Sequence, residues 1–196
     1  EEANIERCLA SVRGLVSEIV VVDSGSIDRT CELAQKHGAR VIRQEWLGYG
    51  PQKAFGATQA THDWILSLDA DEALSPELAA EISDKFKTLD PQTGYEMPRK
   101  SFHMGRWILH GGWYPDRQLR LFNRQHSNWS EAGIHEKVQC ARTERLREPI
   151  LHWVFRNLSH QIETNNRYSS LQAEDLKKRG VRFSYFKLCF KPWVKF

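Results

Sequence analysis

The stretch that decides the fold is residues 63–72, DWILSLDADE, in which a short apolar run stops at a cluster of acids. A run of this length, bounded by polar residues, is typical of a buried strand whose end emerges at a sheet edge. Open α/β sheets bind ligands at the carboxyl ends of their strands, so Asp69 and Asp71 are candidate binding residues. Two carboxylates one residue apart can hold a divalent cation against phosphate oxygens. The alternative is an acidic loop after a core strand.

A second apolar run, residues 18–23, also ends in an acid, Asp23, and the turn residues Ser24-Gly25-Ser26 follow it. Asp23 either caps this turn or accepts hydrogen bonds from a base or ribose. Asp69 could likewise accept hydrogen bonds from ribose hydroxyls. Two acid-terminated strands in one unit favour a nucleotide site.

Helix and strand patterns alternate over the first half of the chain. Apolar spacing and cap residues predict helices at 3–15, 29–37, 51–61 and from 76 onward, and strands at 18–23, 40–43 and 63–69. This order predicts an α/β fold, Rossmann-like, with three α/β/α layers and a mostly parallel central sheet.

The amino-acid composition changes at Gly94, beyond which Trp, Arg and His are frequent and the predicted strands are short. We therefore divide the chain into residues 1–93, which would bind the nucleotide, residues 94–156, which would form a second half of the same domain, and a helical segment at 157–196. The chain begins without Met and ends inside an aromatic and basic run. We expect it to be truncated at both ends.

Composition excludes several classes of protein. The 196 residues suit one sizeable core, and 40% hydrophobic with 27% charged residues is ordinary for a globular domain. A net charge of +3 is too small to indicate nucleic-acid binding. No apolar stretch approaches the roughly 20 residues of a membrane span. Four scattered cysteines indicate neither a disulfide framework nor a zinc site, and they fit a reducing compartment.

Two further stretches suggest contacts with a substrate. Residues 107–114, WILHGGWY, place Trp113 and Tyr114 beside glycines, as in a flexible wall for a sugar; core packing of the aromatic rings is the alternative. Arg117 and Arg120 alternate with leucines, so that one polar strand face could meet a diphosphate or a phosphorylated acceptor. A solvated strand face is the alternative.

Residues 182–196 mix aromatic and basic side chains. This composition suits a segment at a membrane surface, with rings at headgroup depth and cations on anionic lipid. The alternative is packing against a part of the protein beyond this sequence.

Several motifs together resemble the family-2 glycosyltransferases, which have the GT-A fold. The motifs are EEANIERCL at 1–9, EIVVVDSGSIDRT at 18–30 and DWILSLDADE at 63–72. GGWYPDRQLRLFNR at 111–124 and GIHEKV at 133–138 are similar to the bacterial branch of lipopolysaccharide inner-core β-1,4-glucosyltransferases. The resemblance implies a further strand before Glu1 and makes residues 94–156 the acceptor-side half of the domain.

The resemblance also implies roles for residues on the donor side. Asp23 matches the acid that contacts uracil, and Lys53 lies, by a looser match, where a basic residue approaches the nucleotide. Asp69 and Asp71 match the DxD pair, with Asp71 the direct ligand of Mn²⁺ or Mg²⁺.

The catalytic base implied by the resemblance is Glu136, since the acid pair that serves other branches is absent here, and Asp116 is the second candidate. Without the family, Glu136 reads as a structural acid paired with Lys137 or Arg142. His135 could orient Glu136, contact the metal or be an ordinary hydrogen-bonded histidine.

These roles imply an inverting hexosyltransferase. It would move a hexose, in the first instance glucose, from a UDP-sugar to a lipopolysaccharide-core or similar glycolipid acceptor, with the metal and Arg117 or Arg120 offsetting charge on the leaving diphosphate. We expect a cytoplasmic enzyme, peripheral on the inner face of the bacterial inner membrane. The alternatives are an inactive carbohydrate- or membrane-binding module and a phosphohydrolase with Asp69 as nucleophile.

Overall fold

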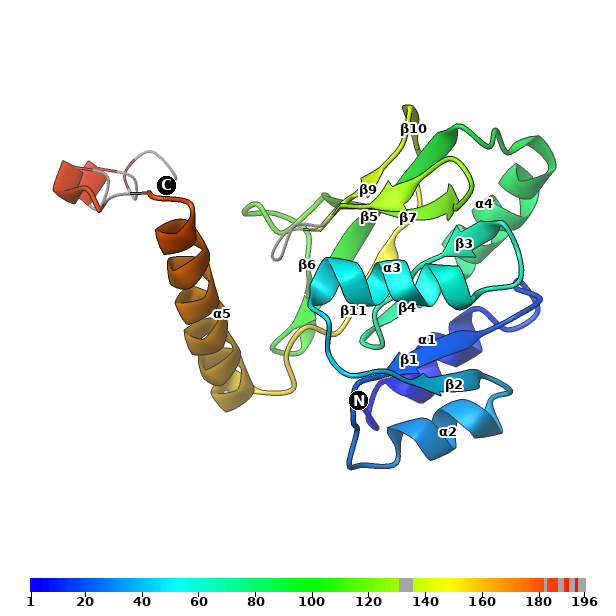
Figure 1. Ribbon diagram of the computed structural model, residues 1–196, viewed down its shortest axis with the longest axis horizontal. Coiled ribbons are helices and arrows are strands. Elements are labelled where there is room, and N and C mark those ends of the chain that lie inside the picture. Colours follow the sequence, from blue (N-terminus) through cyan, green and yellow to red (C-terminus); the bar gives the residue numbers. More distant parts are fainter. Residues whose placement is uncertain (131–135, 182, 187–188, 191–192, 194–196) are drawn as a thin grey trace. The chain divides into compact units, whose positions relative to one another are not determined.

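The computed structural model describes residues 1–196 except 131–135, 182, 187–188, 191–192 and 194–196. The chain divides into two compact units, Glu1–Asn157 and Leu158–Phe196. The first unit holds all the strands of the described residues (Figure 1). The boundary at residue 93, inside this unit, stays a prediction.

The alternation of helices and strands predicted for the first half of the chain is confirmed. The elements are α1 (Ile5–Ser11), β1 (Val20–Asp23), α2 (Thr30–Lys36), β2 (Arg40–Arg43), α3 (Tyr49–Gln59), β3 (Trp64–Leu66), β4 (Glu72–Leu74) and α4 (Pro76–Lys85), with a 3₁₀ turn at Phe86–Thr88. Local chemistry sets the start of α4, because the Ser75 hydroxyl accepts a hydrogen bond from the Leu78 N–H and Pro76 occupies the first turn.

Short strands follow along the rest of the first unit. They are β5 (Thr93–His103), β6 (Arg106–Ile108), β7 (Asp116–Asn123), β8 (Asn128–Trp129), β9 (Val138–Gln139), β10 (Arg142–Arg145) and β11 (Ile150–His152). A seven-stranded sheet has the order β3-β7-β5-β11-β4, with β6 and β10 also paired to β5. Strands β1 and β2 form a separate parallel pair, as β8 and β9 form an antiparallel one.

The α/β class is as predicted, but the expectation of mostly parallel pairing was wrong for the seven-stranded sheet. Only β10 and β11 run parallel to β5, whereas β6 and β7 run antiparallel to it, β3 to β7 and β4 to β11. One of these reversals lies at residues 104–105: Met104 and Gly105 both have positive φ, the geometry of a two-residue hairpin turn, which makes β6 antiparallel to β5.

Helices cover both faces of the seven-stranded sheet. On one face, Ala54 of α3 packs with Phe122 of β7 and Trp129 of β8. On the other, Leu78 of α4 packs with Tyr95 of β5 in the main core. Figure 1 shows α3 in front of the strands and α4 behind them.

Strands β1 and β3 each pair along one edge only within the described residues. Helix α3 lies on β1, where a Cβ on Gly56 would come within 3.3 Å of the Val22 side chain. The strand that the family resemblance places before Glu1 lies outside this sequence, so that expectation is untested.

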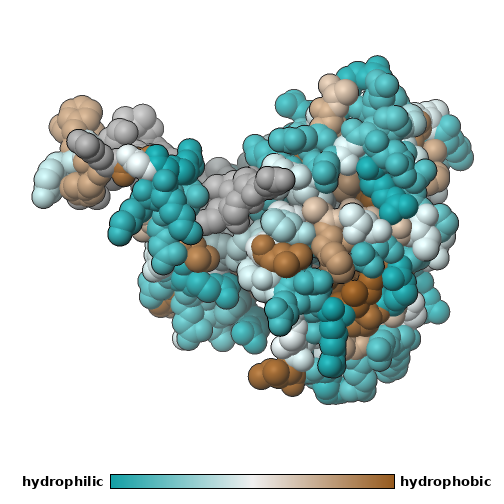
Figure 2. All heavy atoms as spheres, in the orientation of Figure 1, coloured by the Kyte–Doolittle hydropathy of each residue, from teal (hydrophilic) through white to brown (hydrophobic). Residues whose placement is uncertain are grey.

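The second unit contains α5 (Leu158–Lys178), which confirms the helix-compatible pattern of residues 157–180 and buries none of its residues. Hydrophilic residues dominate the visible molecular surface, with hydrophobic ones scattered among them (Figure 2). No described helix has the length and apolar character needed to cross a membrane.

Candidate functional site

The site is built around the loop between β3 and β4, which carries Asp69 and Asp71. Strands β3, β5 and β11 run in the same direction, because β3 and β5 are each antiparallel to β7 and β11 is parallel to β5. Their carboxyl ends therefore meet at one sheet edge. The Trp153 N–H, just beyond β11, donates to the Asp71 carbonyl oxygen at 3.0 Å and fixes the loop there.

Seven side chains form a chain of alternating charge across this edge. From one end to the other they are Glu136, Lys53, Asp69, Arg120, Glu72, Arg99 and Asp116. The N···O distances between successive members lie between 2.6 and 3.0 Å. The chain joins the two candidate bases, Glu136 and Asp116, through the acid Asp69.

The middle of this charged chain is the most buried part. The side chains of Glu72 and Arg120 are 0% and 3% exposed. Glu72 accepts hydrogen bonds from Arg99, from Arg120 and from the Asp69 N–H, so it fixes the loop as well as both arginines. A buried carboxylate requires such partners because leaving it unpaired is costly.

Opposing influences act on the charged forms of Asp69 and Arg120. Burial raises the pKa of Asp69, but Arg120 and Lys53 lower it more, and the net shift is downward. Burial lowers the pKa of Arg120, whereas Asp69 and Glu72 raise it more. Both groups are therefore ionised at neutral pH.

Asp71 stands beside the charged chain. Its Oδ2 lies 3.3 Å from His152 Nε2, and His152 Nδ1 lies 3.3 Å from the Ser101 hydroxyl. Asp71 could hold a divalent cation, since Mg²⁺ is commonly bound by one or two carboxylates together with substrate phosphates, and the His152 imidazole is the second group that could contact the ion. Within the described part of the chain, no group of three or more such ligands converges.

The electrostatics of the site fit a cation. Burial in the first place, and then the carboxylates of Glu72, Asp69 and Asp71, raise the pKa of the neighbouring Cys8 thiol to about 12. The charged chain has four carboxylates for three cations, and Asp71 adds a further negative charge. The predicted ligand His135 lies outside the described residues.

Comparison with known proteins identifies the family. The model of glycosyl transferase family 2 matches residues 1–187. The chain belongs to this family.

Two relatives of this family-2 glycosyltransferase illustrate its range. An uncharacterized glycosyltransferase of Rickettsia felis is 33% identical, over 96% of this chain and 71% of the relative. The lipopolysaccharide core biosynthesis glycosyltransferase LpsC of Rhizobium meliloti is 31% identical, over all of this chain and 75% of LpsC.

The fold of the glycosyltransferase resembles a solved structure. Staphylococcus aureus TarS superposes with a TM-score of 0.52 at 17% identity, over 78% of this chain and 35% of TarS. The predicted GT-A class is confirmed by this likeness of fold and by the family.

Two further predicted binding residues of the glycosyltransferase, Asp23 and Arg117, lie outside the charged chain. The Asp23 carboxylate accepts hydrogen bonds from the N–H groups of Gly25 and Ser26, so it caps the turn, as one of the two alternatives predicted. Burial raises the pKa of Asp23, but these hydrogen bonds lower it more. Arg117 is exposed and donates to the Leu146 carbonyl oxygen, outside the charged chain.

The two aromatic residues predicted to bind the acceptor are half-buried. The Trp113 ring lies 5.4 Å from that of His103, and Tyr114 precedes a cis peptide bond to Pro115. Their sugar-binding role stays a prediction.

Sequence reasoning missed Glu72, Arg99 and His152. Glu72 was visible as the last acid of DADE, and His152 as a polar residue in the apolar run 150–155. Nothing in the sequence distinguishes Arg99 from the other arginines of its region. Only the pairing of β5 with β7 brings Arg99 opposite Asp116.

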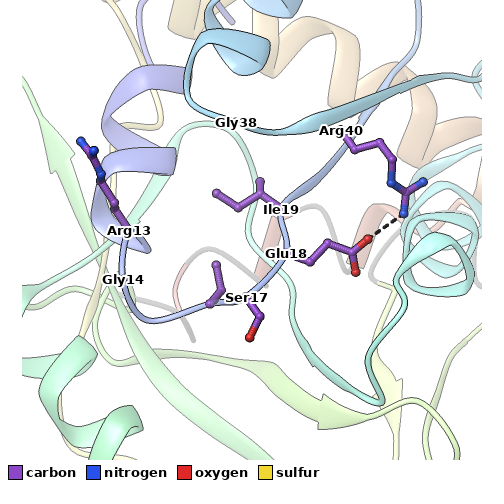
Figure 3. A pocket seen from close by; sticks show the side chains of 8 residues that line it. Arg13, Gly14, Ser17, Glu18, Ile19, Gly38 and Arg40 are labelled. Atoms are coloured by element: carbon purple, nitrogen blue, oxygen red, sulfur yellow. Dashed lines mark hydrogen bonds and ion pairs between the residues drawn. The ribbon is translucent and has the colours of Figure 1, made fainter.

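A cavity of about 290 Å³ lies at the amino end of the β1–β2 pair, opposite the end that carries Asp23. Its lining includes Arg13, Glu18, Gly38 and Arg40, and Figure 3 shows these residues around the amino ends of both strands. None of its lining residues belongs to the charged chain, so this cavity is not part of the charged site.

Proposed function

We propose that the glycosyltransferase moves a hexose, in the first instance glucose, from a UDP-sugar to a lipopolysaccharide-core or similar glycolipid acceptor. The observation that carries the proposal is the charged chain, in which Asp69 lies between the two candidate bases and Asp71 lies beside His152. Membership of family 2 and the likeness to LpsC support glycosyl transfer and this class of acceptor.

In this proposal Asp71 and His152 hold a divalent cation. When bound, the cation supplies positive charge that offsets the charge on the departing diphosphate. Asp69 binds the donor, with its carboxylate kept ionised by Lys53 and Arg120. Asp23 holds the turn at the end of β1 and contacts the uracil.

Glu136 is the proposed base. It takes the proton of the acceptor hydroxyl while that oxygen attacks the anomeric carbon, and the bond from this carbon to the diphosphate breaks with its electron pair leaving on UDP. The single displacement inverts the anomeric centre. Asp116 is the poorer base, because two Arg99 nitrogens bind its Oδ2 and Gln118 binds its Oδ1.

The phosphohydrolase alternative requires Asp69 as a free nucleophile. Its Oδ1 lies 3.0 Å from Lys53 and its Oδ2 lies 2.6 Å from Arg120, so both oxygens are held by cations. This pairing favours a binding role for Asp69 over nucleophilic attack.

We also propose that the enzyme works in the cytoplasm, peripherally on the inner face of the bacterial inner membrane. The support is the set of exposed rings in the described part of the tail, namely Phe183, Tyr185, Phe186, Phe190 and Trp193. Such rings favour headgroup depth in a bilayer.

Calorimetry of UDP and UDP-glucose, with and without Mn²⁺, tests the donor site. The chain should bind both in a metal-dependent way, and Asp71→Ala should lose the metal dependence. Binding that is independent of Mn²⁺ and equally strong in the wild-type chain and in Asp71→Ala would contradict the metal assignment. Failure of the wild-type chain to bind UDP or UDP-glucose would contradict the donor assignment.

A further inference from the structure

A row of two aromatic rings with a cation at each end lies beside the Asp69–Asp71 loop. It consists of Arg7, Trp153, Trp107 and Lys100, hereafter the Arg7–Lys100 row. The Arg7 guanidinium lies 3.8 Å from the centre of the Trp153 ring, and Lys100 Nζ lies 5.2 Å from that of Trp107. The two indole rings meet edge to face, 5.3 Å apart.

Two members of the row, Lys100 and Trp107, share a sheet face with helix α3, which carries Lys53. Leu119 packs with Ala54 of α3, the helix that carries Lys53, and pairs in register with Glu96 of β5. Side chains alternate along a strand, so Lys100 and Phe102 project to the same face as Glu96. Trp107 is the partner of Phe102 across the β5–β6 hairpin and projects there too.

The row is also tied to the donor loop. Trp153 donates its backbone N–H to the Asp71 carbonyl oxygen. Helix α1, which carries Arg7, contacts the same loop through Cys8, whose Sγ lies 3.6 Å from the Asp69 carbonyl oxygen. A ligand on the row would therefore lie next to the bound donor.

The two cations of the row keep their charge unneutralised. Among the residues that the structure describes, neither Arg7 nor Lys100 forms an ion pair, and Arg7 donates only to the Ala3 carbonyl oxygen and the Asn4 side chain. Lys53, Arg99 and Arg120 of the charged chain are, by contrast, all bound to carboxylates. A ring face attracts a cation without cancelling its charge, and so holds it in place for an anion.

We infer that the Arg7–Lys100 row binds the acceptor, and that the acceptor is a saccharide carrying an anionic group such as phosphate or carboxylate. Arginine and lysine recognise these groups through charge-assisted hydrogen bonds. The negatively charged Asp71 lies at the proposed donor side, so the anionic group of the acceptor is drawn to the row and away from this carboxylate. This inference rests on the proposed glycosyl transfer.

Calorimetry with mannose 6-phosphate, mannose and inorganic phosphate tests the inference on the chain in the presence of UDP and Mn²⁺. We expect binding of mannose 6-phosphate but not of mannose. The affinity for mannose 6-phosphate should fall about fivefold or more in each of three variants, Arg7→Gln, Lys100→Gln and Trp107→Leu. The third variant keeps both cations and removes only the ring that holds Lys100 in place. Lys87→Gln, which removes an equal charge from an exposed lysine, should change nothing.

Thermal unfolding of each variant, and its binding of UDP with Mn²⁺, separate loss of the row from loss of the fold. Mannose 6-phosphate affinity equal in wild type and row variants, or absent from the wild type, would overturn the inference. So would row variants that lose affinity only for phosphatidylglycerol vesicles, which would make the row a headgroup site. Failure of the wild type to bind UDP would overturn the proposed function instead, whatever the sugar phosphate does.

Discussion

At the scale of single residues, Glu72 holds the charged chain together. Its buried carboxylate is shared by two arginines, and each arginine also binds a second acid, Asp69 or Asp116. Removing one partner from a buried ionic group leaves the remaining charges uncompensated, which costs more than the pair itself contributes. Through the two arginines, Glu72 therefore influences both Asp69 and the candidate base Asp116.

We expect Glu72→Gln to lower the free energy of unfolding by about 3–5 kcal/mol, because Arg99 and Arg120 lose their common carboxylate. Urea unfolding at pH 7 measures this change. Glu144→Gln is the matched control, since it breaks the more exposed pair with Lys85 and should cost only about 0–1 kcal/mol. Equal effects of the two substitutions would contradict the central position of Glu72.

The two candidate bases are distinguished by isosteric amides. Glu136→Gln should reduce turnover with a glycosyl acceptor by about 100-fold or more while UDP binding is retained, because only proton transfer is lost. Asp116→Asn should have the smaller effect. Steady-state kinetics paired with UDP calorimetry gives both values, and the reverse ranking would assign the base to Asp116.

At the scale of elements, one exposed cluster fastens the amino ends of β1 and β2 to the end of α3. Arg40, at the start of β2, donates to the Glu18 carboxylate and to the Gln59 carbonyl oxygen. Glu18 also accepts hydrogen bonds from the N–H and hydroxyl of Thr61. Together these bonds fix the β1–β2 pair against α3, beside the cavity of Figure 3.

This cluster makes stability depend on pH. The hydrogen bonds from Arg40 and Thr61 lower the pKa of Glu18 from 4.5 to about 2. Because the pKa of Glu18 is lower in the folded than in the unfolded protein, its carboxylate stabilises the fold at pH values above 4.5. This stabilisation is lost as the pH falls from 4.5 toward 2. Glu18→Gln should cost about 1 kcal/mol at pH 7 and less at pH 3, a difference that urea unfolding at both pH values measures. A cost that is unchanged at pH 3 would contradict the pairing.

At the scale of the whole molecule, the charged site and the exposed aromatic tail belong to different compact units. The first unit carries the sheet and the charged chain, and the second carries α5 and the tail. Trp193 in the tail is 84% exposed, whereas most aromatic rings of the first unit contact other rings within it. The proposed membrane attachment and the proposed sugar transfer can therefore be tested separately.

Binding to phosphatidylglycerol vesicles tests this separation. Trp193→Ser should weaken vesicle binding about tenfold, because it removes a ring that would be buried at headgroup depth, and should leave UDP binding unchanged. Trp46→Ser, at an exposed tryptophan of the first unit, is the control. Raising the salt concentration should weaken binding further, since the attraction is partly electrostatic. Equal vesicle binding by both variants and wild type would contradict a role for the tail.

Local sequence patterns were enough to predict the helices and strands of the first half of the chain and their order. Apolar spacing, the Ser75-Pro76 start of α4 and the acid-terminated strands depend on neighbours within a few residues, so they could be predicted before any pairing was known. The motifs around Asp23, Asp69 and Glu136 likewise indicated the family that the comparison then identified.

Only the tertiary structure decided how the strands pair and which charges meet. The Met104–Gly105 turn reverses β5 into β6, so the sheet is mixed, and the register of β5 with β7 puts Arg99 opposite Asp116. Members of the charged chain lie as far apart in sequence as Lys53 and Glu136, which no local pattern relates. Ion pairs at that separation depend on the packing of the whole sheet, and for this reason Glu72, Arg99 and His152 could not be assigned from the sequence.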